Sequence, residues 1–283
     1  MRSVKFLIAA GAASLLSSVA FAADMPSITP PPPMAYAPPP ADFGGWYLRG
    51  DIGFSNQSVS RRDYYSYPTL LSLQQQSSFD TGGIFDVGVG YQFNNWFRAD
   101  VTGQYRGKAN FHGLDLTSYS DTGTVQRGSD NYSASKSEIV VLGNVYADLG
   151  TWWCMTPFVG AGVGMSRNTI SNFTDTGANG TFAFGTVPSL ASAASASKWN
   201  FAWALHTGVA YHVTPNMVVE LAYSYMNLGD GVTGALVTKD GVTANQAMTF
   251  KDITSHDVKL GVRWNFDSAP QPVYAPPPLI RKG

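Results

Sequence analysis

The sequence predicts an all-β protein, an eight-stranded antiparallel transmembrane β-barrel with a signal peptide and proline-rich tails at both ends. Segments of about ten residues alternate apolar and polar side chains, and the connections between them alternate between short and long. The 283 residues include 29 Gly, 14 Tyr, 16 Phe and 7 Trp, yet only 13% are charged. The mean hydropathy of -0.06 is expected when lipid-facing and lumen-facing residues alternate and cancel.

A helical membrane protein is disfavoured, because no apolar run outside the extreme N-terminus reaches about 18 residues, roughly the length that a spanning helix needs. The formal net charge of -1 does not suggest a nucleic-acid partner. The single cysteine, Cys154, excludes an internal disulfide and a paired-cysteine metal site. We expect it to be an apolar thiol that is buried or lies at an interface.

Residues 1–22 are predicted to be a secretory signal peptide. Arg2 and Lys5 precede an apolar stretch, and Ala20-Phe21-Ala22 fits the small-residue pattern of a cleavage site. Cleavage at that point makes Ala23 the first residue of the mature chain. Export from the cytoplasm follows.

Proline-rich segments flank the predicted barrel, residues 45–266. Residues 23–44 are expected to form an extended polyproline spacer, and residues 267–283 form a second tail. The sequence YAPPP occurs in both, starting at Tyr36 and at Tyr274. Two matching tails indicate that both chain ends leave the barrel on the same side, which an even number of strands provides.

The first three strand segments show the alternation clearly. Gly45–Ser55 sets four apolar side chains on one face against Arg49 and Asp51 on the other. The second and third segments form one hairpin between Val87 and Val101, with aliphatic and aromatic residues on its outer face and a turn at Asn94-Asn95.

The fourth and fifth segments continue the pattern. Glu138–Leu149 alternates aliphatic residues with acidic and amide side chains. Pro157–Met165 alternates aliphatic residues with Gly160, Gly162 and Gly164. We expect these glycines to leave room for larger side chains opposite.

The last three segments show the same alternation of apolar and polar side chains. Trp199–Val213 places large apolar residues outward and His206 inward, and Met217–Tyr225 sets apolar and aromatic residues against Glu220. His256–Phe266 has one apolar face that ends in aromatic residues, while its other face carries charged side chains.

The connections indicate an orientation. Short links follow segments two, four and six, whereas those after segments one, three, five and seven run to roughly 25 to 30 residues, far beyond an ordinary loop. Long loops at one end and short turns at the other are the layout of bacterial outer-membrane barrels. We expect polar loops at Arg61–Gln76 and Asp115–Ser137. A turn at Lys239-Asp240-Gly241, within Leu236–Val242, is expected to extend strands seven and eight as a hairpin.

Four stretches carry a combined signature: GWYLRGDIGFS from Gly45, VGYQFNNWFRADV from Val89, PFVGAGVG from Pro157, and VRWNF ending at Phe266. Together they resemble the small alphaproteobacterial outer-membrane proteins of the RopB-like group, a "porin family" whose barrel is related to the eight-stranded membrane domain of OmpA. The resemblance covers about residues 45–266 and implies a structural and surface role. The porin label does not establish conductance. Such barrels usually end on the aromatic residue of the last strand, whereas this chain continues, so the barrel-assembly machinery would have to recognise an internal signal.

The predicted lumen is polar and charged. Eight strands enclose an interior just wide enough for side chains to fill. Because an unpaired buried ion costs several kcal/mol, we expect a salt-bridged plug rather than an ion pathway. The inward-facing residues predicted to form this polar network are Arg49, Asp51, Asp86, Arg98, Asp100, Glu138, Asp148, Glu220, Asp257, Lys259 and Arg263, with Arg106 also pointing inward.

Catalytic, cofactor and metal sites are not predicted. A His and a Ser that cooperate on one strand must be two residues apart, but Ser255 and His256 are adjacent and point to opposite faces. His112, in a predicted loop, is expected to be a solvated side chain rather than a haem ligand. Gly229-Asp230-Gly231 is expected to be a turn rather than a calcium loop.

These observations predict an outer-membrane structural and surface protein that contributes to envelope integrity, with its loops extracellular and its termini periplasmic. Its expected partners are outer-membrane lipid and lipopolysaccharide, the barrel-assembly machinery and, through the Ala23 amine, peptidoglycan. No nucleic acid and no cofactor are expected. The alternatives are a small porin-like channel or a surface receptor for haem or a host ligand, and a barrel enzyme that acts on lipid. A merely flexible tail is the alternative to the peptidoglycan tether.

Overall fold

The computed structural model describes residues 44–63, 69–121, 123–181, 185–239, 243–244 and 246–266. Every described residue belongs to one compact unit. The predicted signal peptide, the C-terminal tail and, apart from Gly44, the N-terminal spacer lie outside the described residues. The described ranges contain no helix that is long and apolar enough to cross a membrane.

All regular structure in the described ranges is β-strand, which confirms the predicted all-β antiparallel fold. The strands are β1 (Gly45–Asp63), β2 (Leu70–Phe79), β3 (Gly82–Gln92), β4 (Phe97–Asp121), β5 (Thr124–Asp148), β6 (Met155–Thr181), β7 (Gly185–Ala193), β8 (Ala196–His212), β9 (Met217–Asn227), β10 (Gly231–Val232), β11 (Leu236–Thr238), β12 (Thr243–Ala244) and β13 (Thr249–Asn265).

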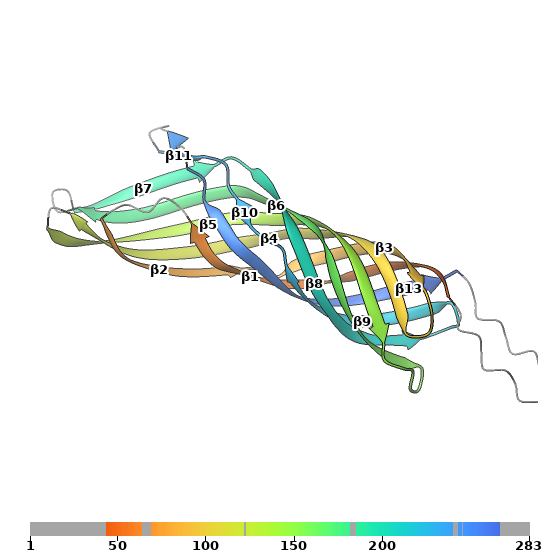
Figure 1. Ribbon diagram of the computed structural model, residues 1–283. Helices are drawn as coiled ribbons and strands as arrows, with labels where there is room; N and C mark the ends of the chain where they lie inside the picture. The colour runs from red at the N-terminus through yellow and green to blue at the C-terminus, as the bar shows by residue number, and fades with distance from the viewer. Residues whose placement is uncertain are drawn as a thin grey trace, which may run out of the picture. The chain divides into compact units, whose positions relative to one another are not determined.

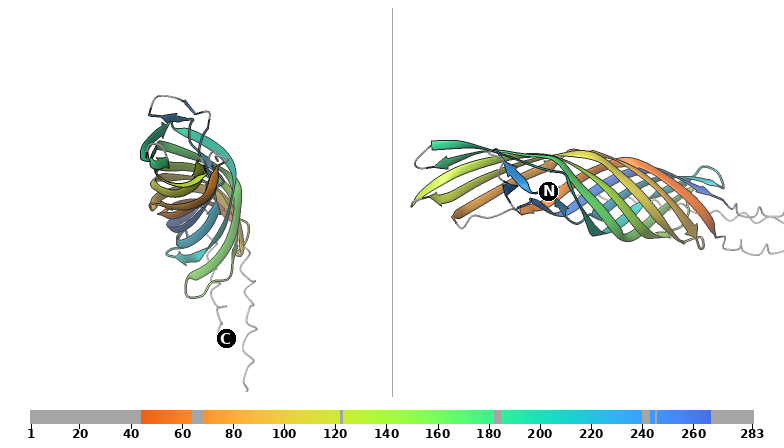
Figure 2. Two further views of the ribbon diagram at one scale, coloured as in Figure 1. Left: turned by 90° about the vertical axis from the view of Figure 1, so that its left-hand side faces the viewer. Right: turned by 90° about the horizontal axis from the view of Figure 1, so that it is seen from above.

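Antiparallel pairing closes a ring. Among the described residues it runs through β1, β3, β4, β5, β6, β8, β9 and β13, and β13 pairs back to β1. The strands lie obliquely around this ring (Figure 2). Each predicted segment lies within one of these strands or ends within a residue or two of it. Strands β2, β7, β10, β11 and β12 are additions that pair with the ring or with one another.

Several ring strands are far longer than a membrane requires. β4, β5 and β6 contain 25, 25 and 27 residues, whereas a spanning β-strand needs about 9–11. Figure 1 shows these strands continuing past the ends of β3 and β9. The loops expected at Asp115–Ser137 and Arg61–Gln76 were therefore wrong for most residues. The first is the far part of the β4–β5 hairpin. The second holds the end of β1 and the start of β2, while residues 64–68 between them lie outside the described residues.

The outer surface of the ring carries a continuous apolar band. Its exposed residues include Trp46 to Phe54 on β1, Phe85 to Phe93 on and just after β3, and Val258 to Phe266 on and just after β13, at alternate positions. Similar rows occur on β4, β5, β6, β8 and β9. Such a band is what a lipid-facing surface requires, and we call this part of the ring the membrane zone.

Beyond the membrane zone the alternation inverts. We call this part the extension: β2, β7, β11 and β12, together with Lys108–Asp121 of β4, Thr124–Ser135 of β5, Asn172–Thr181 of β6 and the ends of β1 and β13 that pair at Arg61–Asp63. Phe111 on β4 and Tyr132 on β5 are buried inside it, while Asn131 is exposed on the outside. A polar exterior and an apolar interior are the arrangement of a β-sheet in water.

β-Bulges account for the inversion on two strands. On β4, Arg106 pairs with Glu138 and Ala109 pairs with Lys136, so two β4 residues lie opposite one residue of β5. The extra residue moves every later β4 side chain to the other face. On β6 a similar irregularity includes Asn172, whose φ is 53°.

An apolar cluster fills the interior of the extension and the adjoining part of the membrane zone. Phe111 packs against Phe79 and Phe250, with ring centroids 5.0 and 4.9 Å apart. The cluster consists of Phe79, Ala109, Phe111, Tyr132, Ala134, Val140, Leu142, Ile170, Phe173, Ala202, Ala204, Met226, Leu228, Met248, Phe250 and Ile253. We call it the apolar plug.

The expected hairpin at Leu236–Val242 was only half right. β11 and β12 do pair with each other, with residues 240–242 between them outside the described residues, but they do not prolong β9 and β13. β11 instead pairs with β7, where Leu236 lies opposite Ala193. The residues that prolong the last ring strand are Thr249 to Lys251, which pair with the end of β1.

Candidate functional site: the ion-paired interior

The structure buries all eleven predicted network residues inside the ring, each at most 7% exposed. They come from β1, β3, β4, β5, β9 and β13. Their placement follows from the period of two, because inward positions on paired antiparallel strands share one face. Together with Arg106 and Lys136 we call them the ionic layer. It contains six cations and seven carboxylates.

Glu220 is the centre of one half of the ionic layer. Its carboxylate lies 3.2 Å from Arg263 Nε, 3.3 Å from Arg98 Nη1 and 3.5 Å from Arg49 Nη2. Three guanidinium groups from β13, β4 and β1 therefore converge on one side chain of β9. Removing that side chain would leave all three cations under-compensated in a buried setting.

Arg49 and Arg98 connect Glu220 to further carboxylates. Arg49 pairs with Asp51 at 3.0 Å and with Asp100 at 3.1 Å, and Arg98 pairs with Asp148 at 3.2 Å. The Arg98 guanidinium also lies 4.3 Å from the centroid of the Tyr146 ring. This geometry favours a cation–π contact.

The other half of the ionic layer lies nearer the apolar plug. Arg106 pairs with Asp257 and, at 3.5 Å, with Glu138, which in turn pairs with Lys136. Gln57 from β1 donates to Glu138 at 3.0 Å and accepts from Lys136 at 2.7 Å.

Lys259 pairs with Asp86 at 3.2 Å and completes the ion pairs of the layer. Every carboxylate predicted for the lumen therefore has a cationic partner. A fully paired arrangement is the condition under which buried charges are tolerated.

Several bonds of the ionic layer cross the lumen. Arg49 on β1 donates to the Tyr146 hydroxyl on β5 at 3.1 Å, although β1 pairs only with β3 and β13 in the ring. Arg106 on β4 reaches Asp257 on β13, which is likewise not its neighbour. These side chains fill the interior rather than line its wall.

Glycines accommodate this filling on β6, as the sequence predicted. A Cβ at Gly160 would collide with the Tyr146 ring, and one at Gly162 would collide with the Asn144 amide. Asn144 in turn donates to Asp100 at 2.8 Å, and its amide oxygen lies 3.2 Å from His206 Nε2. At Gly164 the obstacle is instead the backbone of β5.

The sequence reasoning missed Lys136, because its segment was assigned to a loop. The signal was present: continuing the period of two from Glu138 back along the chain places Lys136 on the same inward face. It also missed the neutral members, Gln57, Asn144 and Tyr146, which hydrogen-bond to the charged groups.

Other residues singled out from the sequence lie apart from this network. The His112 side chain is 62% exposed, and its Nε2 lies 4.0 Å from Asp80 Oδ2. Asp230 accepts hydrogen bonds from Lys198, Lys251 and the Asp252 backbone N–H, so this carboxylate is held in a turn by protein donors. Cys154 is exposed in the β5–β6 turn. In the described ranges, no three His, Cys, Asp or Glu side chains group to hold a metal ion.

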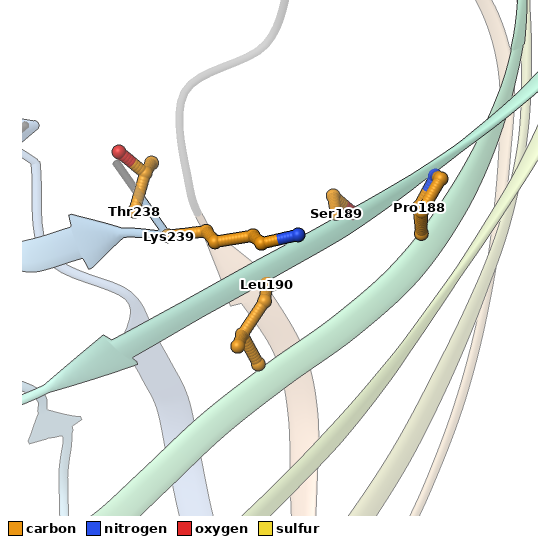
Figure 3. A pocket seen from close by; sticks show the side chains of 5 residues that line it. All are labelled: Pro188, Ser189, Leu190, Thr238 and Lys239. Atoms are coloured by element: carbon orange, nitrogen blue, oxygen red, sulfur yellow. The ribbon is translucent and has the colours of Figure 1, made fainter. Parts of the chain in front are cut away.

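A depression of about 500 Å³ lies on the extension, between β7 and the end of β11. Figure 3 shows its lining, with Lys239 extending along β7 toward Ser189 and Pro188. It is open to solvent and contains no concentration of reactive groups.

Comparison with known proteins identifies the chain. The family model described as "Outer membrane protein beta-barrel domain" matches residues 10–266. The chain belongs to this family. Members of the outer membrane protein β-barrel family lie in the bacterial outer membrane, so the apolar band faces lipid.

Individual relatives of this β-barrel family member are distant. An uncharacterized protein of Brucella abortus is 26% identical over 277 residues, 89% of this chain and 95% of the relative. The outer membrane protein PagN of Salmonella typhimurium is 28% identical over 231 residues, 78% of this chain and 90% of PagN. Among solved structures, the outer membrane protein OprG of Pseudomonas aeruginosa is similar with a TM-score of 0.47 and 12% identity, over 80% of this chain and 98% of OprG.

Proposed function

We propose that this protein is a structural and surface protein of the outer membrane that contributes to envelope integrity, and that its barrel is closed to solutes. The observation that carries the proposal is the ionic layer, whose side chains bond across the lumen. The apolar plug lies beyond it, and Tyr146, Phe158, Ala210, Val218 and Ala222 form a smaller apolar cluster elsewhere in the interior. Three successive fillings leave little room for a water column.

Planar-bilayer recording tests this proposal against the small-channel alternative. The purified barrel should give no sustained conductance steps. A variant with Arg98→Ser and Tyr146→Ser removes two of the large side chains that cross the interior, and it should conduct more than the parent protein. Reproducible steps from the parent protein, with ion selectivity that follows the lumen charges, would overturn the closed-barrel proposal.

The chain ends support the proposed orientation, with termini periplasmic and the extension extracellular. Tyr47 pairs with Asn265, and Phe266 donates its backbone N–H to Trp46. Both ends therefore leave the ring side by side. They do so at the end where β3–β4 and β8–β9 are joined by short turns.

The tether to peptidoglycan stays a proposal that concerns Ala23, outside the described residues. A spacer of residues 23–44 could span up to about 70 Å at polyproline rise, enough to reach the cell wall from the membrane. Muramidase digestion of purified sacculi should release the protein with muropeptide mass on the Ala23 amine. An unmodified Ala23 throughout the cell-wall fraction would leave the flexible-tail alternative.

A surface receptor is the second candidate, because the extension projects a large sheet beyond the membrane zone. Haem is the ligand class that His112 could contact, since its imidazole is exposed on the extension. Haem titration followed by absorbance should show no saturable shift if the structural role is correct. A saturable shift that His112→Ala abolishes would favour the receptor.

A further inference from the structure

One outward-facing row of side chains marks the boundary between the membrane zone and the extension. Tyr105 on β4 lies opposite Ile139 on β5, Ile139 lies opposite Arg167 on β6, and Arg167 lies opposite Trp199 on β8. All four side chains are exposed on the outer wall. A guanidinium group is thus inserted into an apolar and aromatic row.

The rows on either side define the position of Arg167. Toward the membrane zone, the next row is Val141, Met165 and Phe201, which is wholly apolar. Toward the extension, the next row is Ser137, Thr169 and Ser197, in which the last two hydroxyls lie 2.9 Å apart. Arg167 therefore lies where apolar side chains give way to hydroxyl groups.

A second cation lies near the same boundary. Lys108 follows Tyr105 by three residues on β4 and is exposed at the bulge. Strand spacings of roughly 4.8 Å put the Arg167 and Tyr105 backbones about 10 Å apart, with Lys108 about 10 Å farther along β4. Two long side chains on one wall can therefore reach groups of a single large ligand.

Neither cation has a carboxylate partner among the described residues, whereas three other cations on the outer surface do. Arg61 pairs with Asp63 at 2.8 Å, and Lys198 and Lys251 both pair with Asp230. Arg127 and Lys239 are also exposed without a carboxylate partner among the described residues, but they lie within the extension and not at its boundary with the membrane zone. Arg167 and Lys108 keep their charge available to an external anion.

The opposite wall differs at the same level. Beyond Phe54 and Val258, its next row contains Asn56, His256 and Tyr225. His256 Nδ1 lies 2.6 Å from the Tyr223 hydroxyl, so that imidazole is engaged by a neighbour. Lys108 on β4 and Arg167 on β6 belong to the wall formed by β4, β5, β6 and β8.

We propose that Arg167 and Lys108 bind the phosphate groups of a phosphorylated glycolipid in the outer leaflet. The guanidinium fork matches phosphate geometry, and charge-assisted hydrogen bonds are the strong ones. Acyl chains would lie along the Val141, Met165 and Phe201 row, while the hydroxyl row contacts the sugar. The phosphates, acyl chains and sugar of such a lipid therefore each face a matching surface: the two cations, the apolar row and the hydroxyl row. The site rests on the proposed orientation, in which the extension points outward.

Native mass spectrometry of the full barrel in detergent tests the site, with purified bisphosphorylated lipid A as the probe. Both cations are exposed, so the double variant Arg167→Gln and Lys108→Gln should fold normally, and heat-modifiability on a gel checks this. Its lipid A binding should fall at least about tenfold, because both charge-assisted contacts to phosphate are removed. Arg61→Gln, at an ion-paired cation, is the matched control and should bind as the parent does.

Three outcomes would overturn the site. The double variant could bind lipid A as well as the parent does, phosphate-free glycolipid could bind equally well, or inorganic phosphate at equal concentration could displace the lipid. Because this assay is performed in detergent, it does not depend on orientation in the cell. A failed orientation test with an intact lipid A response would therefore be distinguishable from failure of the site.

Discussion

The membrane zone and the extension are built from the same strands but have opposite polarity. On β5, Val141 faces outward in the membrane zone and Lys136 faces inward toward the ionic layer. A few residues away in the extension, Asn131 faces outward and Tyr132 inward. The comparison teaches that the surrounding medium decides which face is apolar. Lipid requires an apolar exterior and accepts a charged interior, whereas water requires the reverse.

The largest effect is expected from breaking the ionic layer at Glu220. Glu220→Ala leaves three buried guanidinium groups under-compensated, and removing one partner of a buried pair costs about 3 to 5 kcal/mol. Urea unfolding in detergent or vesicles would measure it. Asp63→Ala is the control, because the exposed Arg61–Asp63 pair is worth about 0 to 1 kcal/mol. Equal stability of the two variants would show that the ionic layer does not stabilise the barrel.

A substitution in the apolar plug should destabilise the extension without destabilising the membrane zone. Phe111→Ala removes a fully buried ring that packs on Phe79 and Phe250, at a cost of about 3 to 5 kcal/mol. We expect hydrogen exchange to accelerate in the extension while the membrane zone stays protected. Acceleration spread evenly over both parts would mean that they unfold as one unit.

The extension should also depend on pH through Asp175 on β6. Burial, with the nearby Asp130 and Asp115 carboxylates, raises the pKa of Asp175 to about 7. A pKa raised in the folded state favours the protonated fold, so this stabilisation is complete below the unfolded value of about 3.8 and is lost as pH rises through about 7. The extension should therefore be less stable at pH 8 than at pH 5.

Asp175→Asn is the matched variant for this effect, because it keeps the shape and removes the titration. Denaturation midpoints of the extension should become much flatter between pH 5 and pH 8. Hydrogen bonds from Lys198 and Lys251 lower the pKa of Asp230, so this carboxyl group contributes to the pH dependence of stability only below pH 5. An unchanged pH dependence in Asp175→Asn would assign the effect to another group.

The smallest effect concerns orientation, that is, which of the two regions faces the cell exterior. Testing it by labelling requires no change in the stability of the protein. The native Cys154 lies in the β5–β6 turn, and a membrane-impermeant maleimide should label it only after the outer membrane is permeabilised. A variant with Cys154→Ala and Asn131→Cys moves the thiol to the exterior of the extension and should be labelled on intact cells. The reverse pattern would invert the proposed topology.

The sequence predicted the membrane zone well because each of its strands keeps an unbroken period of two. Arg98 and Glu220 could be assigned inward from that period alone. Their contact could not be predicted, because pairing across the lumen depends on the closure of the ring. The extension was hidden for a different reason. The two-against-one bulge that includes Lys108, and the irregularity at Asn172, interrupt the period of two on β4 and β6. The outer face of the extension is polar because it faces water, so the sequence of its strands resembles that of loops.

The most direct test of the inversion places the same charge on the same strand in both regions. Val145 and Asn131 both point outward on β5, one near the middle of the membrane zone and one in the extension. Val145→Arg should lower the free energy of unfolding by about 2 to 4 kcal/mol, the cost of a cation on the lipid face near the midplane. Asn131→Arg should change it by less than about 0.5 kcal/mol, as for other exposed surface substitutions. Equal costs at the two positions would contradict the account, because one medium would then surround both regions.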